Sequence, residues 1–129
     1  MTIDTFLFDL DGTLVDSIPD LTKAINLLRE ELDLAAITSI EVRGYVGDGV
    51  GLLLQRALPE ELFNLHRRKR FMEIYAEHLT DETVIYPGIL DFLDMHRDKP
   101  MAVVTNKPQH LADIIVDRLG LSPFFKCVI

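Results

Sequence analysis

The feature that most constrains this chain is an apolar run near its N-terminus that ends directly in two aspartates. Phe6–Phe8 leads into Asp9 and Asp11, which one leucine separates, and Gly12 follows. Open α/β sheets place their ligand sites outside the carboxyl ends of the strands. If extended geometry continues through the pair, both carboxylates lie on one side, because strand side chains alternate. Two like charges held together are costly without a cation, so the spacing predicts a hard divalent metal, most simply Mg²⁺. The alternative is a solvated acidic turn that caps the next helix.

Composition and charge narrow the classes of function. The 129 residues suffice for one compact domain or for a small core with a modest insertion, and 48% hydrophobic residues are ordinary for a soluble globular protein. A net charge of −8 argues against nucleic acid or an anionic membrane surface as the main partner. The single cysteine, Cys127, fits a reducing compartment, and neither a signal peptide nor a membrane-spanning stretch is visible. We therefore expect a cytoplasmic protein.

The hydrophobic pattern predicts an α/β protein with a parallel sheet and a helical insertion. An apolar run indicates a strand buried on both faces at residues 3–8, and similar runs indicate a buried strand at 101–104 and the opening of a third strand at 127–129. Helical periodicity is expected at 17–32, 39–45, 50–58, 59–79, 89–98 and 110–119. The stretch from 17 to 85 is too long for one crossover. We therefore expect a core of residues 1–16 and 86–129, with residues 17–85 inserted as a helical cap.

The run Asp9–Ser17, with the sequence Asp-Leu-Asp-Gly-Thr-Leu-Val-Asp-Ser, resembles the first signature of the haloacid dehalogenase-like superfamily of aspartate-nucleophile phosphohydrolases. The match is unbroken over nine residues. It implies a Rossmann-like core and hydrolysis of a phosphate monoester through an aspartyl-phosphate. In that family the side chain of the first aspartate and the backbone carbonyl of the second bind Mg²⁺. The resemblance therefore implies metal-binding roles for Asp9 and Asp11.

The same residues have expected roles in the chemistry. A carboxylate can attack phosphorus when a metal offsets the repulsion between two anions, so Asp9, nearest the strand, is the expected nucleophile. Asp11 can give a proton to the leaving oxygen and later take one from water. Gly12 lets the backbone approach the phosphate, whose oxygens can accept hydrogen bonds from the N–H groups of the turn.

Thr105, Asn106 and Lys107 follow the second predicted strand and are candidates for binding the phosphate. The Thr105 hydroxyl, Asn106 and the neighbouring N–H groups suit phosphate oxygens. Thr105 matches the second motif of the superfamily, a serine or threonine that ends this strand. Standing alone, it would be an N-cap or turn residue. Lys107 either adds positive charge near the phosphate or faces solvent.

A glycine-rich loop in the insertion indicates the substrate. Arg43–Gly49 resembles the cap loop of bacterial phosphoglycolate phosphatases, which implies 2-phosphoglycolate as substrate and Arg43 and Gly47 as specificity residues. Tyr86–Gly88 fits the point at which their chain re-enters the core. The glycines predict unusual φ values or a close approach, and such a loop could close over a small phosphorylated metabolite. The alternative is a helix–helix connection whose glycines only make a tight turn.

The resemblance covers essentially the whole chain, but the chain covers only part of the family's pattern. The family's third motif, a lysine, and the acidic motif that completes its Mg²⁺ site would follow Ile129. Lys126 is a poor substitute for that lysine, and Lys107 a partial one. We therefore expect the N-terminal part of a longer enzyme, with little phosphatase activity and weak Mg²⁺ affinity alone. The bare edge beside the first strand could pair with another copy to form a homo-oligomer.

Alternative functions remain open at this point. The leading hypothesis is a Mg²⁺-dependent phosphatase, with 2-phosphoglycolate as the first substrate to test. Another small phosphate ester, such as a sugar phosphate, could be the substrate of a related phosphatase or mutase. A dehalogenase is disfavoured, because Asp11 has a role in the departure of an ester oxygen that halide displacement lacks. A non-catalytic binding or regulatory protein on a truncated core is the alternative from a different class.

Overall fold

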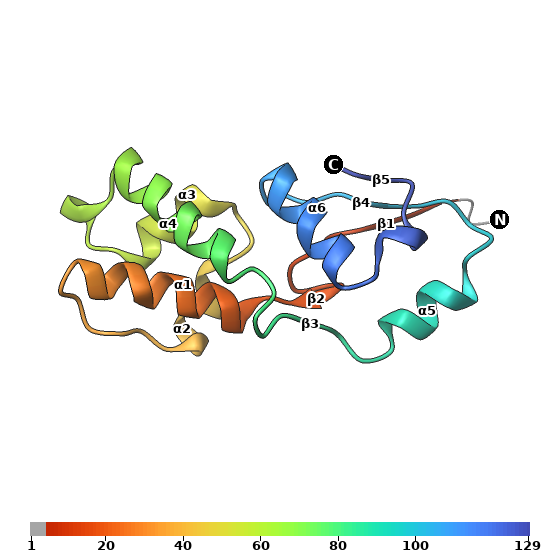
Figure 1. Ribbon diagram of the computed structural model, residues 1–129, viewed down its shortest axis with the longest axis horizontal. Coiled ribbons are helices and arrows are strands. Elements are labelled where there is room, and N and C mark those ends of the chain that lie inside the picture. Colours follow the sequence, from red (N-terminus) through yellow and green to blue (C-terminus); the bar gives the residue numbers. More distant parts are fainter. Residues whose placement is uncertain (1–4) are drawn as a thin grey trace. The chain divides into compact units, whose positions relative to one another are not determined.

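The computed structural model describes residues 5–129 and divides into two compact units (Figure 1). The sheet unit consists of the described residues up to Asp16 together with Val84–Ile129. The helical unit consists of Ser17–Thr83. Ile3 and Asp4, which belong to the predicted first strand, lie outside the described residues.

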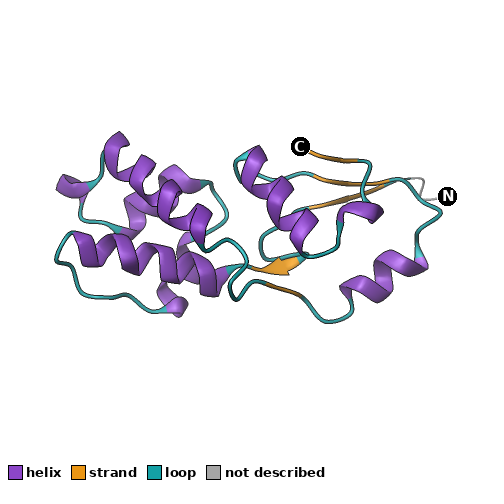
Figure 2. Ribbon diagram, in the orientation of Figure 1, coloured by secondary structure: helices purple, strands orange, loops and turns teal. Residues whose placement is uncertain are grey.

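The described part of the sheet unit contains a parallel sheet of three strands in the order β1-β4-β5. The strands are β1 (Phe6–Phe8), β4 (Met101–Val103) and β5 (Cys127–Val128). The connections contain α5 (Ile89–Met95), α6 (Gln109–Arg118) and the 3₁₀-helix η2 (Ser122–Phe124), as Figure 2 shows. Both pairings within this sheet are parallel, as helical crossovers require. The prediction of an α/β fold with a parallel sheet is therefore confirmed.

The strands differ in burial according to their places in the sheet. The central strand β4 is buried along its whole length, as predicted. In β1, an edge strand of the described sheet, Leu7 is by contrast 68% exposed, on the face opposite to Phe6 and Phe8, because side chains alternate along a strand. Rings of Phe6 and Phe8 contact the ring of Phe92, with centroids 5.5 and 6.0 Å apart, so one face of β1 is covered. The prediction that the first strand is buried on both faces is therefore wrong.

A small antiparallel ribbon lies where the chain leaves and re-enters the sheet unit. β2 (Val15–Asp16) pairs with β3 (Val84–Ile85), and the Tyr86 N–H donates to the carbonyl of Leu14 at 3.0 Å. Val84 and Ile85 were expected in the helical insertion, but they pair within the sheet unit. The return to the sheet unit therefore comes two residues before the predicted boundary at 86.

The helical unit is built from amphipathic helices whose apolar faces pack together. Its helices are α1 (Ile18–Glu31), α2 (Ser39–Tyr45), α3 (Val50–Ala57), the 3₁₀-helix η1 (Glu60–Leu62) and α4 (Leu65–Glu77). α1 packs against α2 and α4. It buries Leu21, Ile25 and Leu28, which recur on one face at helical spacing.

The predicted helix from 59 to 79 is wrong at its start. Asn64 has extended backbone angles, and its side-chain oxygen accepts a hydrogen bond from the Arg67 N–H at 2.8 Å. This capping geometry ends the preceding 3₁₀ turn and begins a separate helix. Leu65, the first residue of this helix, is 77% exposed.

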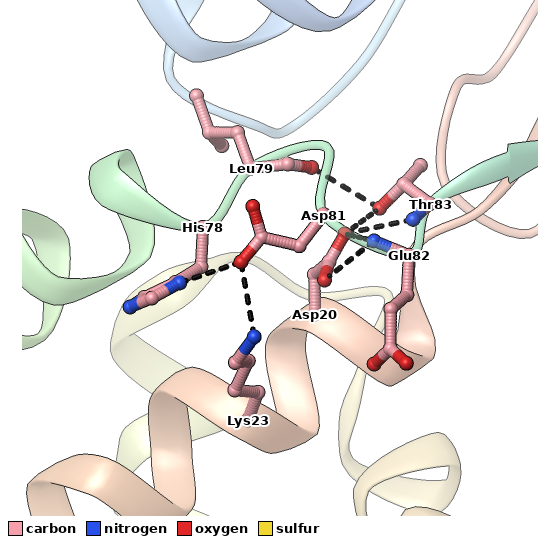
Figure 3. A network of polar contacts seen from close by, with 7 residues as sticks. All are labelled: Asp20, Lys23, His78, Leu79, Asp81, Glu82 and Thr83. Carbon is pink, nitrogen blue, oxygen red and sulfur yellow. Dashed lines mark hydrogen bonds and ion pairs between the residues drawn. The ribbon is translucent and has the colours of Figure 1, made fainter.

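A buried carboxylate links the beginning of the helical unit to its end (Figure 3). Asp20 in α1 has no exposed surface, and its oxygens accept hydrogen bonds from the N–H groups of Glu82 and Thr83 at 2.8–3.0 Å. The hydroxyl of Thr83 also donates to Asp20, at 2.6 Å. Asp81 beside this network forms ion pairs with Lys23 at 3.0 Å and His78 at 2.6 Å. Asp20 therefore ties segments together that lie 62 residues apart in the sequence.

Candidate active site

The turn after β1 holds the two aspartates on a backbone that is anchored in the core. Leu10 and Leu14 are fully buried, and the Leu14 N–H donates to the Leu10 carbonyl at 3.0 Å. Regular strand geometry ends at Phe8, so strand alternation does not place Asp9 and Asp11; the turn does. Asp9 is exposed, and its Oδ1 accepts a hydrogen bond from the next backbone N–H at 2.7 Å. A carboxylate in this position is accessible to a ligand.

Gly12 needs the conformational freedom of glycine. Its φ is +81°, a left-handed conformation that residues with a side chain rarely adopt. Its N–H donates to the Val15 carbonyl at 2.9 Å and closes the turn. A Cβ at this position would meet nothing within 4 Å. The backbone conformation therefore requires glycine, and there is open space beside the turn.

The turn after β4 is held between the neighbouring strands. The Val104 N–H donates to the Phe8 carbonyl at 2.8 Å, and the Thr105 N–H donates to the Ile129 carbonyl at 3.0 Å. The Thr105 hydroxyl oxygen accepts a hydrogen bond from the Lys107 N–H at 3.1 Å. Thr105 is thus a turn residue, yet a hydroxyl that accepts one bond can still donate its own hydrogen to a phosphate oxygen. Asn106, between them, is exposed.

Lys107 connects this turn to the turn after β1. Its side chain is only 6% exposed, and its Nζ lies 3.4 Å from Oδ1 of Asp11. Burial lowers the pKa of Lys107, while the Asp11 carboxylate opposes that shift. The alternative in which Lys107 faces solvent is therefore wrong. The structure brings Asp11 and Lys107 together, 96 positions apart in the chain, at the carboxyl ends of two adjacent parallel strands.

The acidic groups at this edge fit part of a magnesium shell. Mg²⁺ prefers oxygen ligands and usually combines one or two carboxylates with several waters. The Asp9 side chain and the Asp11 backbone carbonyl are oxygen donors of this kind. Within residues 5–129, however, no group of three or more His, Cys, Asp and Glu side chains is placed to hold a metal ion.

Arg43 and Gly47 lie in the helical unit. Arg43 is exposed in the last turn of α2, and Gly47 is exposed in the following loop with a φ of +118°. The prediction of unusual φ values in this loop is confirmed. The loop is also held from α3: Arg56 donates to the Tyr45 carbonyl and pairs with Asp48, both at 2.9 Å. This clamp is not apparent from the sequence, where Arg56 is one of several exposed helix residues.

The described chain matches the family model "Haloacid dehalogenase-like hydrolase" over residues 6–129, and so over both units. The chain belongs to this family. The first motif, which the match includes, is the exposed Asp9 with Asp11 and Gly12 on their anchored turn. The resemblance predicted from Asp9–Ser17 is therefore confirmed.

Relatives and solved structures agree with this assignment. The chain is 40% identical to a phosphoglycolate phosphatase from Chromobacterium violaceum, and the alignment covers 98% of this chain and 61% of that protein. It is 35% identical to a phosphoglycolate phosphatase from Caulobacter vibrioides, covering 97% and 56%. A crystal structure described as a predicted phosphoglycolate phosphatase from Haemophilus somnus superposes with a TM-score of 0.91 at 31% identity, covering 100% of this chain and 63% of that one. The chain thus spans less than two thirds of the length of these proteins.

The helices of both units are short, and α1, with 14 residues, is the longest one described. Within the part of the chain that the structure describes, no helix is long and apolar enough to cross a membrane.

Proposed function

We propose that the protein carrying this chain is a Mg²⁺-dependent phosphomonoester hydrolase that acts through an aspartyl-phosphate. The observation that carries this proposal is the meeting of two motif-bearing turns at the carboxyl ends of β1 and β4. One turn presents Asp9 and Asp11, the other Thr105 and Lys107, and the contact between Lys107 and Asp11 joins them. A nucleophile and groups suited to phosphate oxygens therefore belong to one edge of the sheet.

The proposed reaction has two halves. In the first, an Asp9 oxygen forms a bond to phosphorus, the bond from phosphorus to the ester oxygen breaks, and Asp11 gives that oxygen its proton. In the second, Asp11 takes a proton from water, whose oxygen attacks phosphorus and releases Asp9 and inorganic phosphate. When bound, Mg²⁺ supplies positive charge that offsets the repulsion between Asp9 and the phosphate. Asp9 and the carbonyl of Asp11 would hold it.

The phosphoryl oxygens need hydrogen-bond donors on this edge. We assign that role to the backbone N–H groups beside Gly12 and to Thr105 and Asn106. The open space beside Gly12 and the hydroxyl hydrogen of Thr105 support this assignment. Arg43 and Gly47 belong to the helical unit, which we propose as the cap, and we propose them as specificity residues.

We propose 2-phosphoglycolate as the substrate. The names of the relatives support it, and so does the cap loop Arg43–Gly49. The protein would then act on a small phosphorylated metabolite, with neither nucleic acid nor membrane as partner, in the cytoplasm. A homo-oligomer formed through the exposed edge of β1 stays a prediction.

The test is phosphate release by the complete natural protein, measured with 2-phosphoglycolate, glucose 1-phosphate and pyrophosphate. Each is assayed with Mg²⁺ and with a chelator. We expect Mg²⁺-dependent release with the highest kcat/KM for 2-phosphoglycolate. A higher kcat/KM for glucose 1-phosphate would indicate that the substrate is another small phosphate ester, such as a sugar phosphate. No release from any of them would favour a binding or regulatory protein.

A further inference from the structure

Lys107 has surroundings that are uncommon for a lysine. Lysine side chains are almost never fully buried unless they are paired, yet this one is only 6% exposed. One partner within ion-pair distance is Asp11, whose own side chain is 23% exposed. The ammonium is therefore shielded from water, while the carboxylate keeps one side open toward solvent or a ligand.

Both partners project from backbone segments that are fixed independently. The base of Lys107 is fixed by its N–H bond to the Thr105 hydroxyl, and Thr105 is itself bonded to the Ile129 carbonyl. The base of Asp11 lies in the turn anchored by buried Leu10. With both backbones held, the rotation of the Asp11 side chain is the freedom that remains. A buried cation 3.4 Å from one carboxylate oxygen restricts that rotation.

We propose that Lys107 is a positioning residue for Asp11. Its ammonium fixes the direction of the Asp11 carboxyl group, so that this group is oriented for proton transfer to the leaving oxygen. This inference rests on the proposed function, in which Asp11 is the acid and base. It differs from a role of Lys107 as phosphate ligand, because a positioning residue acts through Asp11 and not through affinity for phosphate.

The two roles predict different dependence on the leaving group. The alkoxide that leaves 2-phosphoglycolate needs a proton, whereas p-nitrophenolate leaves p-nitrophenyl phosphate without one. kcat/KM reports the steps up to formation of the aspartyl-phosphate. The Lys107→Met variant of the complete protein should therefore lose roughly 10–100-fold in kcat/KM on 2-phosphoglycolate, at or below the lower end of the about 10²–10⁴-fold that general acid catalysis provides. On p-nitrophenyl phosphate the loss should be under about threefold, since the acid step is not needed there.

Additional variants separate the positioning role from direct phosphate binding and from a purely structural role. Lys107→Arg keeps a cation, so its ratio of kcat/KM on 2-phosphoglycolate to kcat/KM on p-nitrophenyl phosphate should stay near that of the wild type. In an Asp11→Asn background, Lys107→Met should lower kcat/KM on 2-phosphoglycolate little further, because the carboxyl group that Lys107 positions is already gone. Lys107→Gln is measured beside Lys107→Met, so that unfolding of the apolar variant leaves the comparison intact. Thermal unfolding of every variant checks the fold.

The outcomes distinguish this inference from the proposed function. If the wild type is active but Lys107→Met and Lys107→Gln lose the same factor in kcat/KM on both esters, the positioning role alone is overturned. The same holds if these variants need more inorganic phosphate than the wild type for inhibition. Full additivity of Lys107→Met with Asp11→Asn would overturn it as well. A wild type that hydrolyses neither ester would overturn the proposed function, and the inference with it.

Discussion

Replacing Asp20 by alanine should strongly destabilise the folded chain. The carboxylate is fully buried and accepts hydrogen bonds from two backbone N–H groups and one hydroxyl. A hydrogen bond to a charged group contributes about 1.5–3 kcal/mol, and a buried donor left unpaired costs about 1–3 kcal/mol. These terms do not simply add, because the Thr83 hydroxyl can turn to the Leu79 carbonyl, 3.1 Å away. We therefore expect the free energy of unfolding to fall by about 3–5 kcal/mol.

Urea denaturation followed by far-ultraviolet circular dichroism measures this loss. With a slope of about 1–3 kcal/mol per molar urea, the midpoint should fall by roughly 2 M. Asp81→Ala is the matched control, because Asp81 belongs to the same network but is 38% exposed and its ion pairs are solvated. It should shift the midpoint far less. Equal shifts for the two variants, or no shift for Asp20→Ala, would refute the claim that burial makes Asp20 the decisive member of this network.

The remaining predictions also concern stability. Hydrogen bonds from His78 and Lys23 hold the pKa of Asp81 below its ordinary value of 3.8, so the unfolded chain binds protons more readily near that pH. The stabilisation by Asp81 is therefore present above about pH 4 and lost as the pH falls through the folded-state pKa, and Asp81→Asn should flatten the acid limb of the stability–pH curve. Gly49→Ala should lower the free energy of unfolding by about 1 kcal/mol, because the φ of Gly49 is +93°. Gly51→Ala, inside α3 and with open space around it, should raise the free energy of unfolding by roughly 0.5–1 kcal/mol. Denaturation midpoints that move in the same direction for both variants would contradict this pair of predictions. Asn64→Ala removes the cap of α4 and should cost about 1 kcal/mol, measured in the same way, and an unchanged midpoint would count against the capping role.

Local signals in the sequence were sufficient for several elements. Thr38 and Glu41 predict the start of α2, and its observed bounds, Ser39–Tyr45, match the expected range because the Thr38 hydroxyl caps the helix. The apolar run at 101–103 forms the central strand because it is uniformly apolar. Asp9 and Thr105 could be placed at strand ends for the same reason. These features depend on residues that are neighbours in sequence.

Other features depend on residues far apart in sequence, and the pattern could not show them. β3 has only two residues, too few for any periodicity, and it forms because β2 pairs with it. The exposure of Leu7 depends on which elements cover its face of β1. The burial of Lys107 and of Asp20 depends on partners 96 and 62 positions away, so the sequence left open whether Lys107 faces solvent.

The most direct test of the central claim is a search for the covalent intermediate on Asp9. The complete protein is mixed with excess 2-phosphoglycolate and Mg²⁺, quenched in acid within milliseconds, digested and mapped by mass spectrometry. The proposed function predicts that the peptide containing Asp9 gains the mass of one phosphoryl group, and that Asp9→Asn abolishes this gain. Turnover without a modified peptide, or a phosphoryl group on another residue, would contradict the assignment of Asp9 as the nucleophile.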